Sequence, residues 1–81
     1  MYTDNMKIAF RSLDNHCPKG FRVNIIDNEH FLTVSADEKT FMSLYDEDKR
    51  RAIEYMVKVK DALERNGAIV LVVRQGGKED V

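Results

Sequence analysis

The chain has a single cysteine, a single proline and no tryptophan. One cysteine excludes an internal disulfide framework and is typical of a protein in a reducing compartment. The sequence also lacks an apolar run near the roughly 18 residues of a membrane span, and its start lacks the basic and apolar regions of a secretion signal. We therefore expect a cytoplasmic protein that is complete in itself and has no membrane partner.

A marked excess of charge of either sign is also missing. Thirteen Lys and Arg residues against fourteen Asp and Glu residues give a net charge of −1. Such a chain has no long-range field to attract nucleic acid, acidic lipid or a basic target. Its 81 residues allow one domain, 1–81. A core of that size buries only about 60% of the unfolded surface, and oligomerisation is a common way to stabilise it.

No set of residues in the sequence converges on catalysis or metal binding. Cys17 follows His16, and an imidazole can take the proton of a thiol, but adjacent side chains seldom face each other and no third orienting group is identifiable. His16, Cys17 and His30 could also act as zinc ligands. A structural zinc site needs four ligands, usually in paired short spacings, and the second pair is missing from this sequence. We expect no enzyme activity, no cofactor, no metal and no small-molecule substrate.

The strongest local pattern is helical and runs from Asp46 to Asn66. Three acidic residues begin it, and Asn66–Gly67 is a typical helix end. Ser43 or Asp46 would be the N-cap. The apolar arc is roughly 200° wide, against the roughly 100° that a helix needs to sit on a sheet. Its central stripe is Tyr45, Ala52, Met56, Val59 and Leu63, with Ile53 and Val57 on one flank and Tyr55 and Ala62 on the other.

The run that follows, from Ala68 to Val73, is apolar on both alternating faces. A strand with this pattern needs to be covered from both sides, and one helix can cover only one of them. Helix and strand therefore both indicate a second contact, which the chain would make with another polypeptide.

A β-hairpin is expected from Phe21–Asp27 and His30–Ala36, turning at Asn28 and Glu29. Pairing outward from the turn places six apolar residues on one face, as a correct register requires. The expected pairs are Asp27 with His30, Ile25 with Leu32, Val23 with Val34 and Phe21 with Ala36. The other face would be mostly solvated and carries Arg22, Asn24, Thr33 and Ser35, with Ile26 and Phe31 near the turn.

The remaining segments give weaker patterns. Met6–Leu13 alternates as a first strand, and a loop follows it. Thr40–Leu44 is interpreted as a short fourth strand. The alternative is a short helix, for which Ser35 and Glu38 would form a capping box and which would place Phe41, Leu44 and Tyr45 on one face. Residues 1–5 and 76–81 are expected to be frayed tails.

The fold class predicted from these elements is α+β. We expect a mostly antiparallel sheet of four to five short strands in the order β-β-β-β-α-β, with the long helix packed on one face. Met56, Val59 and Leu63 of that helix would contact the hairpin and the last strand.

The function that this pattern favours is a small non-enzymatic protein-binding module. It would be a homodimer, or a regulator or inhibitor that covers a surface of a larger protein. Small chains of this kind, including many encoded by viruses and mobile elements, often act in this way. The expected interface residues are Ile53, Val57, Tyr55 and Lys60 on the helix, and Phe31 and Ile26 on the open sheet face.

Nucleic-acid binding is the alternative. Basic residues at the start of the long helix could contact phosphates, and an aromatic sheet face could stack bases. Acidic residues four positions away on the same helix largely offset that charge. The residues of this alternative are Arg22, Phe31, Lys49, Arg50 and Arg51.

Overall fold

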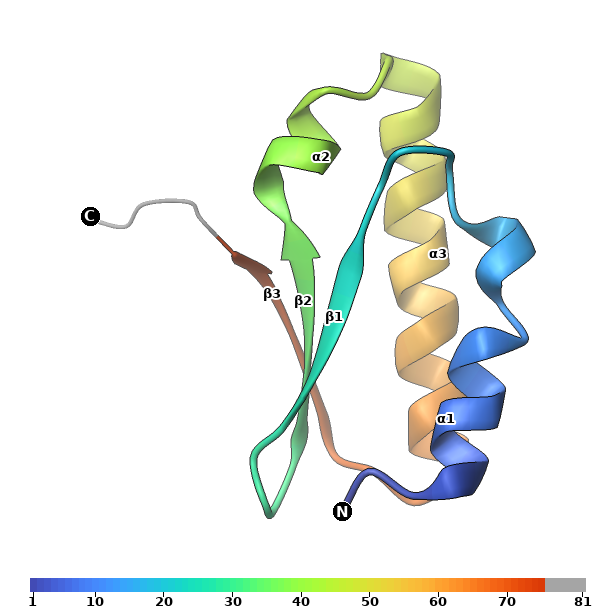
Figure 1. Cartoon of the computed structure of the whole chain (residues 1–81), viewed down its shortest axis with the longest axis vertical. Helices are drawn as coiled ribbons and strands as arrows, with labels where there is room; N and C mark the ends of the chain where they lie inside the picture. The colour runs from blue at the N-terminus through green and yellow to red at the C-terminus, as the bar shows by residue number, and fades with distance from the viewer. Residues whose placement is uncertain (76–81) are drawn as a thin grey trace.

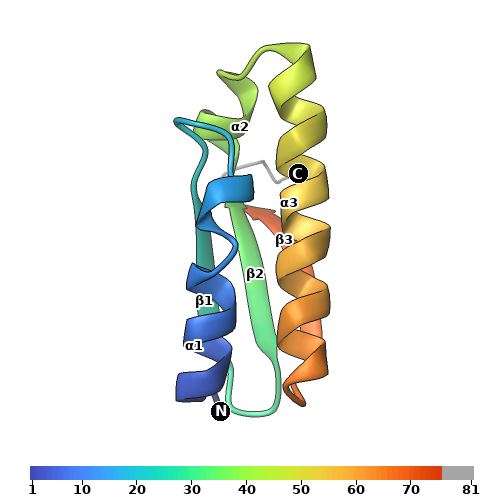
Figure 2. The same cartoon turned by 90° about the vertical axis from the view of Figure 1, so that its right-hand side faces the viewer.

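The computed structural model describes residues 1–75, and the expected tail at 76–81 lies outside the described residues. One layer is a sheet, and the helices α1 and α3 pack together on one of its faces (Figures 1 and 2). The α+β class is therefore correct. The elements in order are α1 (Asp4–Arg11), a 3-10 turn (Asp14–His16), β1 (Val23–Asp27), β2 (Leu32–Asp37), α2 (Glu38–Met42), α3 (Asp46–Arg65) and β3 (Val70–Gln75).

The sheet has the order β1-β2-β3, with β1 antiparallel and β3 parallel to the central strand β2. Parallel neighbours need a crossover connection, which α2 and α3 supply. The prediction of a mostly antiparallel sheet of four to five strands is wrong for the described part of the chain. It fails because the segments expected as the first and fourth strands are the helices α1 and α2.

The first helix replaces the strand expected at Met6–Leu13. The Met6 N–H donates a hydrogen bond of 3.2 Å to Oγ1 of Thr3, which caps the helix. Helical spacing buries Met6, which is 1% exposed, and leaves Ile8 64% exposed. An alternation of a few residues fits either period, and here contact with the core selects the helical one.

Residues 1–5, expected to be a frayed tail, supply this cap and the start of α1. The ammonium group of Met1 lies 2.6 Å from a carboxylate oxygen of Asp27, and the Tyr2 N–H donates to the same oxygen at 3.0 Å. The hydrogen bond from the chain amine, followed by those from backbone N–H groups, lowers the pKa of Asp27. The chain start is thereby joined to the end of β1.

The second helix replaces the strand expected at Thr40–Leu44. The carboxylate of Asp37 accepts hydrogen bonds from the N–H groups of Lys39, at 3.1 Å, and Thr40, at 3.4 Å. The short-helix alternative was therefore correct, although its cap is Asp37 and not Ser35, which lies in β2. Phe41 and Leu44 pack against the core, whereas Tyr45 is exposed.

The hairpin is confirmed, but its register differs by two residues from the expected one. The observed pairs are Val23 with Ala36, Ile25 with Val34 and Asp27 with Leu32. Because side chains alternate with a period of two, this shift leaves the same residues on the core face.

The register changes because the turn lies one residue later than expected. Asn28 donates its N–H to the carbonyl of Phe31 at 2.9 Å, and Glu29 between them has φ of 73°. Asp27 accepts from the Glu29 N–H at 3.1 Å, and the Asn28 side chain donates to Thr33 at 2.8 Å. These polar contacts favour a turn at Glu29 and His30 over one at Asn28 and Glu29.

The face expected to be solvated is partly buried. Thr33 and Ser35 are buried although they point away from the helices. They lie on the central strand, where the register places each short side chain between neighbours on β1 and β3. Ile26 and Leu71 flank Thr33 in this way, so the central strand is covered on both faces.

The helix α3 is confirmed. Its C-terminal end has the cap expected from the sequence, whereas its N-terminal end does not. It begins after Tyr45, which makes no side-chain cap bond, and not after Ser43 or Asp46 as expected. At its end Gly67 has φ of 96° and donates to the Glu64 carbonyl at 3.0 Å, while the Ala68 N–H donates to Leu63 at 3.1 Å. This Schellman motif turns the chain directly into β3.

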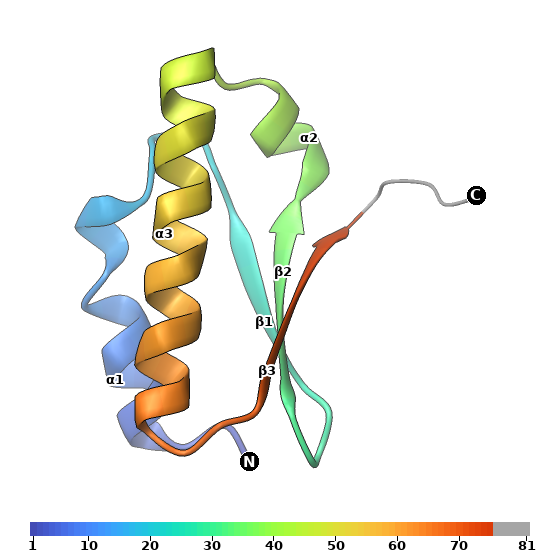
Figure 3. The same cartoon turned by 180° about the vertical axis from the view of Figure 1, so that it is seen from behind.

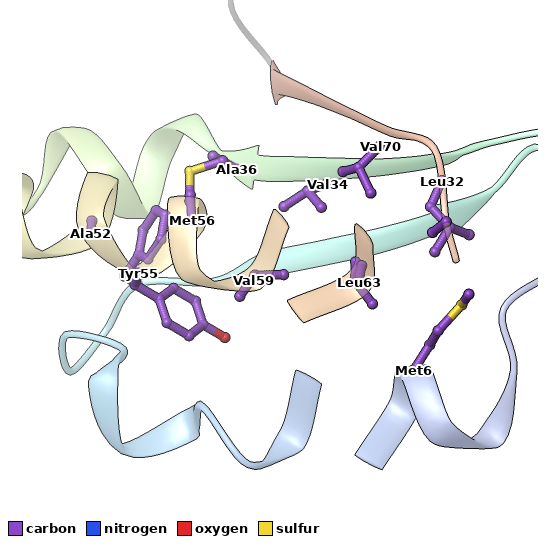
Figure 4. Packing of buried hydrophobic residues seen from close by; sticks show 12 residues of the cluster. Met6, Leu32, Val34, Ala36, Ala52, Tyr55, Met56, Val59, Leu63 and Val70 are labelled. Carbon is purple, nitrogen blue, oxygen red and sulfur yellow. The ribbon is translucent and has the colours of Figure 1, made fainter. Parts of the chain in front are cut away.

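The core lies between α3 and the sheet, with α1 closing one side (Figure 4). The central stripe of α3 is buried as expected, apart from Tyr45, and so is Tyr55 on the flank that α1 covers. The opposite flank, Ile53 and Val57, is exposed. The core residues are Met6, Phe21, Leu32, Val34, Ala36, Ala52, Tyr55, Met56, Val59, Leu63, Ala68 and Val70.

Two substitutions in α1 distinguish its helical placement from the strand expected there. Met6→Ala should lower the free energy of unfolding by about 2–5 kcal/mol, because it leaves a cavity in the core. Ile8→Ala should change it by less than about 0.5 kcal/mol, because that side chain is exposed. Urea denaturation measures both values. A larger effect at Ile8 than at Met6 would show that this segment does not pack as α1.

Candidate functional site

An apolar groove with a volume of about 520 Å³ lies between α3 and β3. The strand starts close to the helix and diverges from it toward its end (Figures 1 and 3). Val70 is accordingly buried and Val72 is 44% exposed. The groove is lined by Ala36, Phe41, Ile53, Met56, Val57, Lys60, Val70, Leu71, Val72, Val73 and Arg74.

The helix side of the groove is the uncovered flank of α3. Ile53 is 55% exposed and Val57 is 52% exposed, although each is an aliphatic side chain on a helix that packs on a sheet. Lys60 borders them and donates to Glu64 at 3.1 Å, so its charge is already paired. A partner that filled the groove could bury these aliphatic groups without leaving a lone charge.

The strand side of the groove is the outer edge of the sheet. The Ile69 carbonyl accepts from the Leu32 N–H at 2.8 Å, so the main chain of Ile69 faces β2. Successive residues of a strand direct their N–H and C=O groups to opposite sides. The main-chain groups of Val70, Val72 and Arg74 therefore point to the outer edge, where no strand among residues 1–75 pairs with them.

An ion pair lies where the groove meets α2. The Nε atom of Arg74 lies 3.5 Å from Oε1 of Glu38. That buried oxygen accepts no hydrogen bond from the described residues. The pair gives this end of the groove its polar boundary.

The structure brings together half of the expected interface. Ile53, Val57 and Lys60 line the groove. Tyr55 is a correction, because it is buried on the opposite flank, where its ring lies 6.4 Å from that of Phe21 in an edge-to-face contact.

Phe31 and Ile26 also lie away from the groove. Ile26 is exposed on the sheet face opposite the helices, and Phe31 belongs to the hairpin turn. The residues that the expected site did not include are those of β3 and Phe41. The apolar pattern of 68–73 already indicated β3, whereas Phe41 reaches the groove only because its segment is helical.

The residues of the nucleic-acid alternative do not form one surface. Arg22 precedes β1 beside α2, since its N–H donates to Thr40 at 3.1 Å, whereas Phe31 lies at the far end of the hairpin. On α3, Lys49 lies 4.0 Å from Asp46 and Arg51 lies 3.1 Å from Asp48, while Arg50 is exposed. Basic and aromatic groups are thus separated, and two of the cations have acidic neighbours.

The neighbourhood of Cys17 disfavours the thiolate. The thiol donates to the Phe21 carbonyl at 3.4 Å. Burial and the nearby Asp14 carboxylate raise the pKa of Cys17, and burial also raises the pKa of Tyr55. His30 pairs instead with Glu29 at 3.2 Å. Within residues 1–75 no group of three His, Cys, Asp or Glu side chains could hold a metal ion.

No helix in the described residues is both long enough and apolar enough to cross a membrane. Comparisons with protein-family models, curated proteins and solved structures found no significant match.

The raised pKa of Cys17 predicts that its thiol is alkylated slowly at neutral pH. At pH 7 its thiolate fraction should be below that of an unfolded cysteine, because burial and Asp14 both disfavour the anion. Alkylation by iodoacetamide should then be several-fold slower in the folded chain than in urea. Faster alkylation of the folded chain would contradict this and would indicate an activated nucleophile.

Proposed function

We propose that this chain is a non-enzymatic protein-binding module that binds another polypeptide through the groove between α3 and β3. The observation that carries the proposal is the coincidence of two open surfaces. The aliphatic flank of α3 faces the unpaired edge of β3 across one groove. Each surface alone is common, but a single binding partner could satisfy both.

The edge of β3 supports the proposal because it lacks the usual protection. Natural edge strands are commonly blunted by lysine, proline, bulges or a covering loop. From Val70 to Val73 every residue of β3 is aliphatic, and the first charge is Arg74. The opposite edge strand, β1, ends instead in Asp27, whose carboxylate holds the chain start.

The partner class that fits is a protein, either a second copy or a larger target that the chain regulates or inhibits. A cytoplasmic location agrees with the single cysteine. The groove is lined mainly by aliphatic residues, and its two cations, Lys60 and Arg74, are already paired with Glu64 and Glu38. A highly charged ligand would leave these aliphatic residues without a complementary surface.

Replacing Ile53 and Val57 by aspartate together should abolish association and leave the chain folded. Both side chains are exposed, so urea denaturation should show a change in unfolding free energy within about 1 kcal/mol. Aspartates in an apolar interface would be desolvated without partners, which is strongly unfavourable. If the double variant unfolds, these residues belong to the core and the proposal loses its basis.

Site-specific photo-crosslinking in the native host measures the association. A photoreactive residue at position 60, inside the groove, should give a protein adduct that the double aspartate variant loses. The same residue at position 51, an exposed position of α3 that does not line the groove or the hollow beside Ile53 and Val57, is the matched control and should give little adduct. Equal adducts at the two positions, or none at position 60, would contradict the proposed function.

A further inference from the structure

We propose that the occupant of the groove is a second copy of this chain, whose β3 pairs antiparallel with β3 and forms a continuous six-stranded sheet. This inference rests on the proposed function and names its partner. It follows from the space beside β3, the direction of its main-chain groups and the charges along α3.

The space beside β3 is suited to a further strand. A helix is about 10 Å wide when packed, whereas neighbouring strands are about 4.8 Å apart, so one helix covers about two strands. The helix α3 packs across β2 and β3, with α1 beside it on the same face of the sheet (Figure 2). No described strand lies beyond β3. A second copy whose β3 paired with this β3 would place its own α3 about two strand spacings, or roughly 10 Å, from this one, which is the spacing of packed helices.

The main chain of β3 is compatible with its own antiparallel copy. Val70, Val72 and Arg74 direct their N–H and C=O groups outward, as derived above from the Ile69 contact. A two-fold axis at Val72 places this residue opposite its own copy and places Val70 opposite Arg74 of the second copy. Each facing pair can exchange two hydrogen bonds, as such pairs do in antiparallel sheets.

The side chains agree with the same axis. On the sheet face away from the helices, Leu71 would lie opposite Val73 of the second copy, which pairs two exposed aliphatic residues. On the helix face, the two α3 helices would lie on the same side of the sheet and run antiparallel. Their Ile53 and Val57 flanks would then face each other over the new strand pair.

Two charged pairs beside the exposed flank of α3 are complementary when the helix is reversed about Val57. We place the axis at the level of Val57 because this residue lines the same groove as Val72. Positions at equal distances before and after Val57 then meet across the axis. Arg50, seven residues before, would approach Glu64 of the second copy, seven residues after. Glu54 and Lys60, three residues on either side, are also of opposite charge, which disfavours a misaligned pairing.

The first test compares two lysine substitutions at edge strands by light scattering. Val72→Lys places two ammonium groups opposite each other at the axis. Ile26→Lys makes the same change on the far edge strand β1, at a residue of similar exposure, 42% against 44%. We expect the natural chain and Ile26→Lys to have twice the monomer mass of 9.4 kDa and Val72→Lys to have the monomer mass. Dissociation by Ile26→Lys alone would overturn the proposal.

The second test uses charge reversal and does not depend on a change in the core. Arg50→Glu alone and Glu64→Arg alone each place like charges across the axis, so each should weaken self-association by about tenfold. An equimolar mixture of the two variants should restore it, because both contacts in the mixed dimer are again of opposite sign. Circular dichroism checks that both variants are folded. No recovery on mixing would overturn the proposed pairing.

The tests separate this inference from the proposed function. If the natural chain is a monomer at every concentration and the adduct at position 60 contains a different protein, the second-copy proposal is wrong and the binding module stands. If position 60 gives no adduct and the chain is a monomer, both are wrong. If the adduct has twice the monomer mass and is lost in the Val72→Lys variant, both the proposed function and the second-copy proposal are supported.

Discussion

The packing of α3 on the central strand β2 is the contact on which the rest of the structure depends. Met56, Val59 and Leu63 of α3 are buried against Leu32 and Val34 of β2, so these two elements form the centre of the core. The chain from β2 through α3 must then return to the sheet, and the Schellman motif after α3 directs it into a strand parallel to β2. The position of β3 at the outer edge follows from this connection.

The same contact explains why apolar surface remains uncovered. The chain places α1 on the Tyr55 flank of α3 and uses the N-terminal residues to join that helix to the end of β1. No described element remains for the flank with Ile53 and Val57 or for the outer edge of β3. A short chain can cover its central strand on both faces and still leave one side of the structure incomplete. In this protein the incomplete side is a groove with a strand edge, and we infer that another chain completes it.

The sequence predicted the elements whose signals are local and repeated. The arc of α3, its end at Gly67 and the doubly apolar pattern of β3 all appear in the residues themselves. Ile53, Val57 and Lys60, which the arc suggested as interface residues, line the groove. The segment of α1 was wrongly predicted as a strand because its alternation fits two periods, and contact of Met6 with the core decides between them. Because that segment is a helix that packs on one flank of α3, Tyr55 on this flank is buried in the core and is not exposed at the expected interface.

Amide hydrogen exchange at Val72 tests the completed edge most directly. Its N–H points away from β2, whereas the N–H of its neighbour Leu71 points toward β2. The account predicts that the Leu71 amide is protected at every protein concentration and that protection of the Val72 amide rises with concentration as the second strand pairs. A Val72 amide that exchanges at the rate of an unstructured peptide at all concentrations, beside a protected Leu71, would contradict the account.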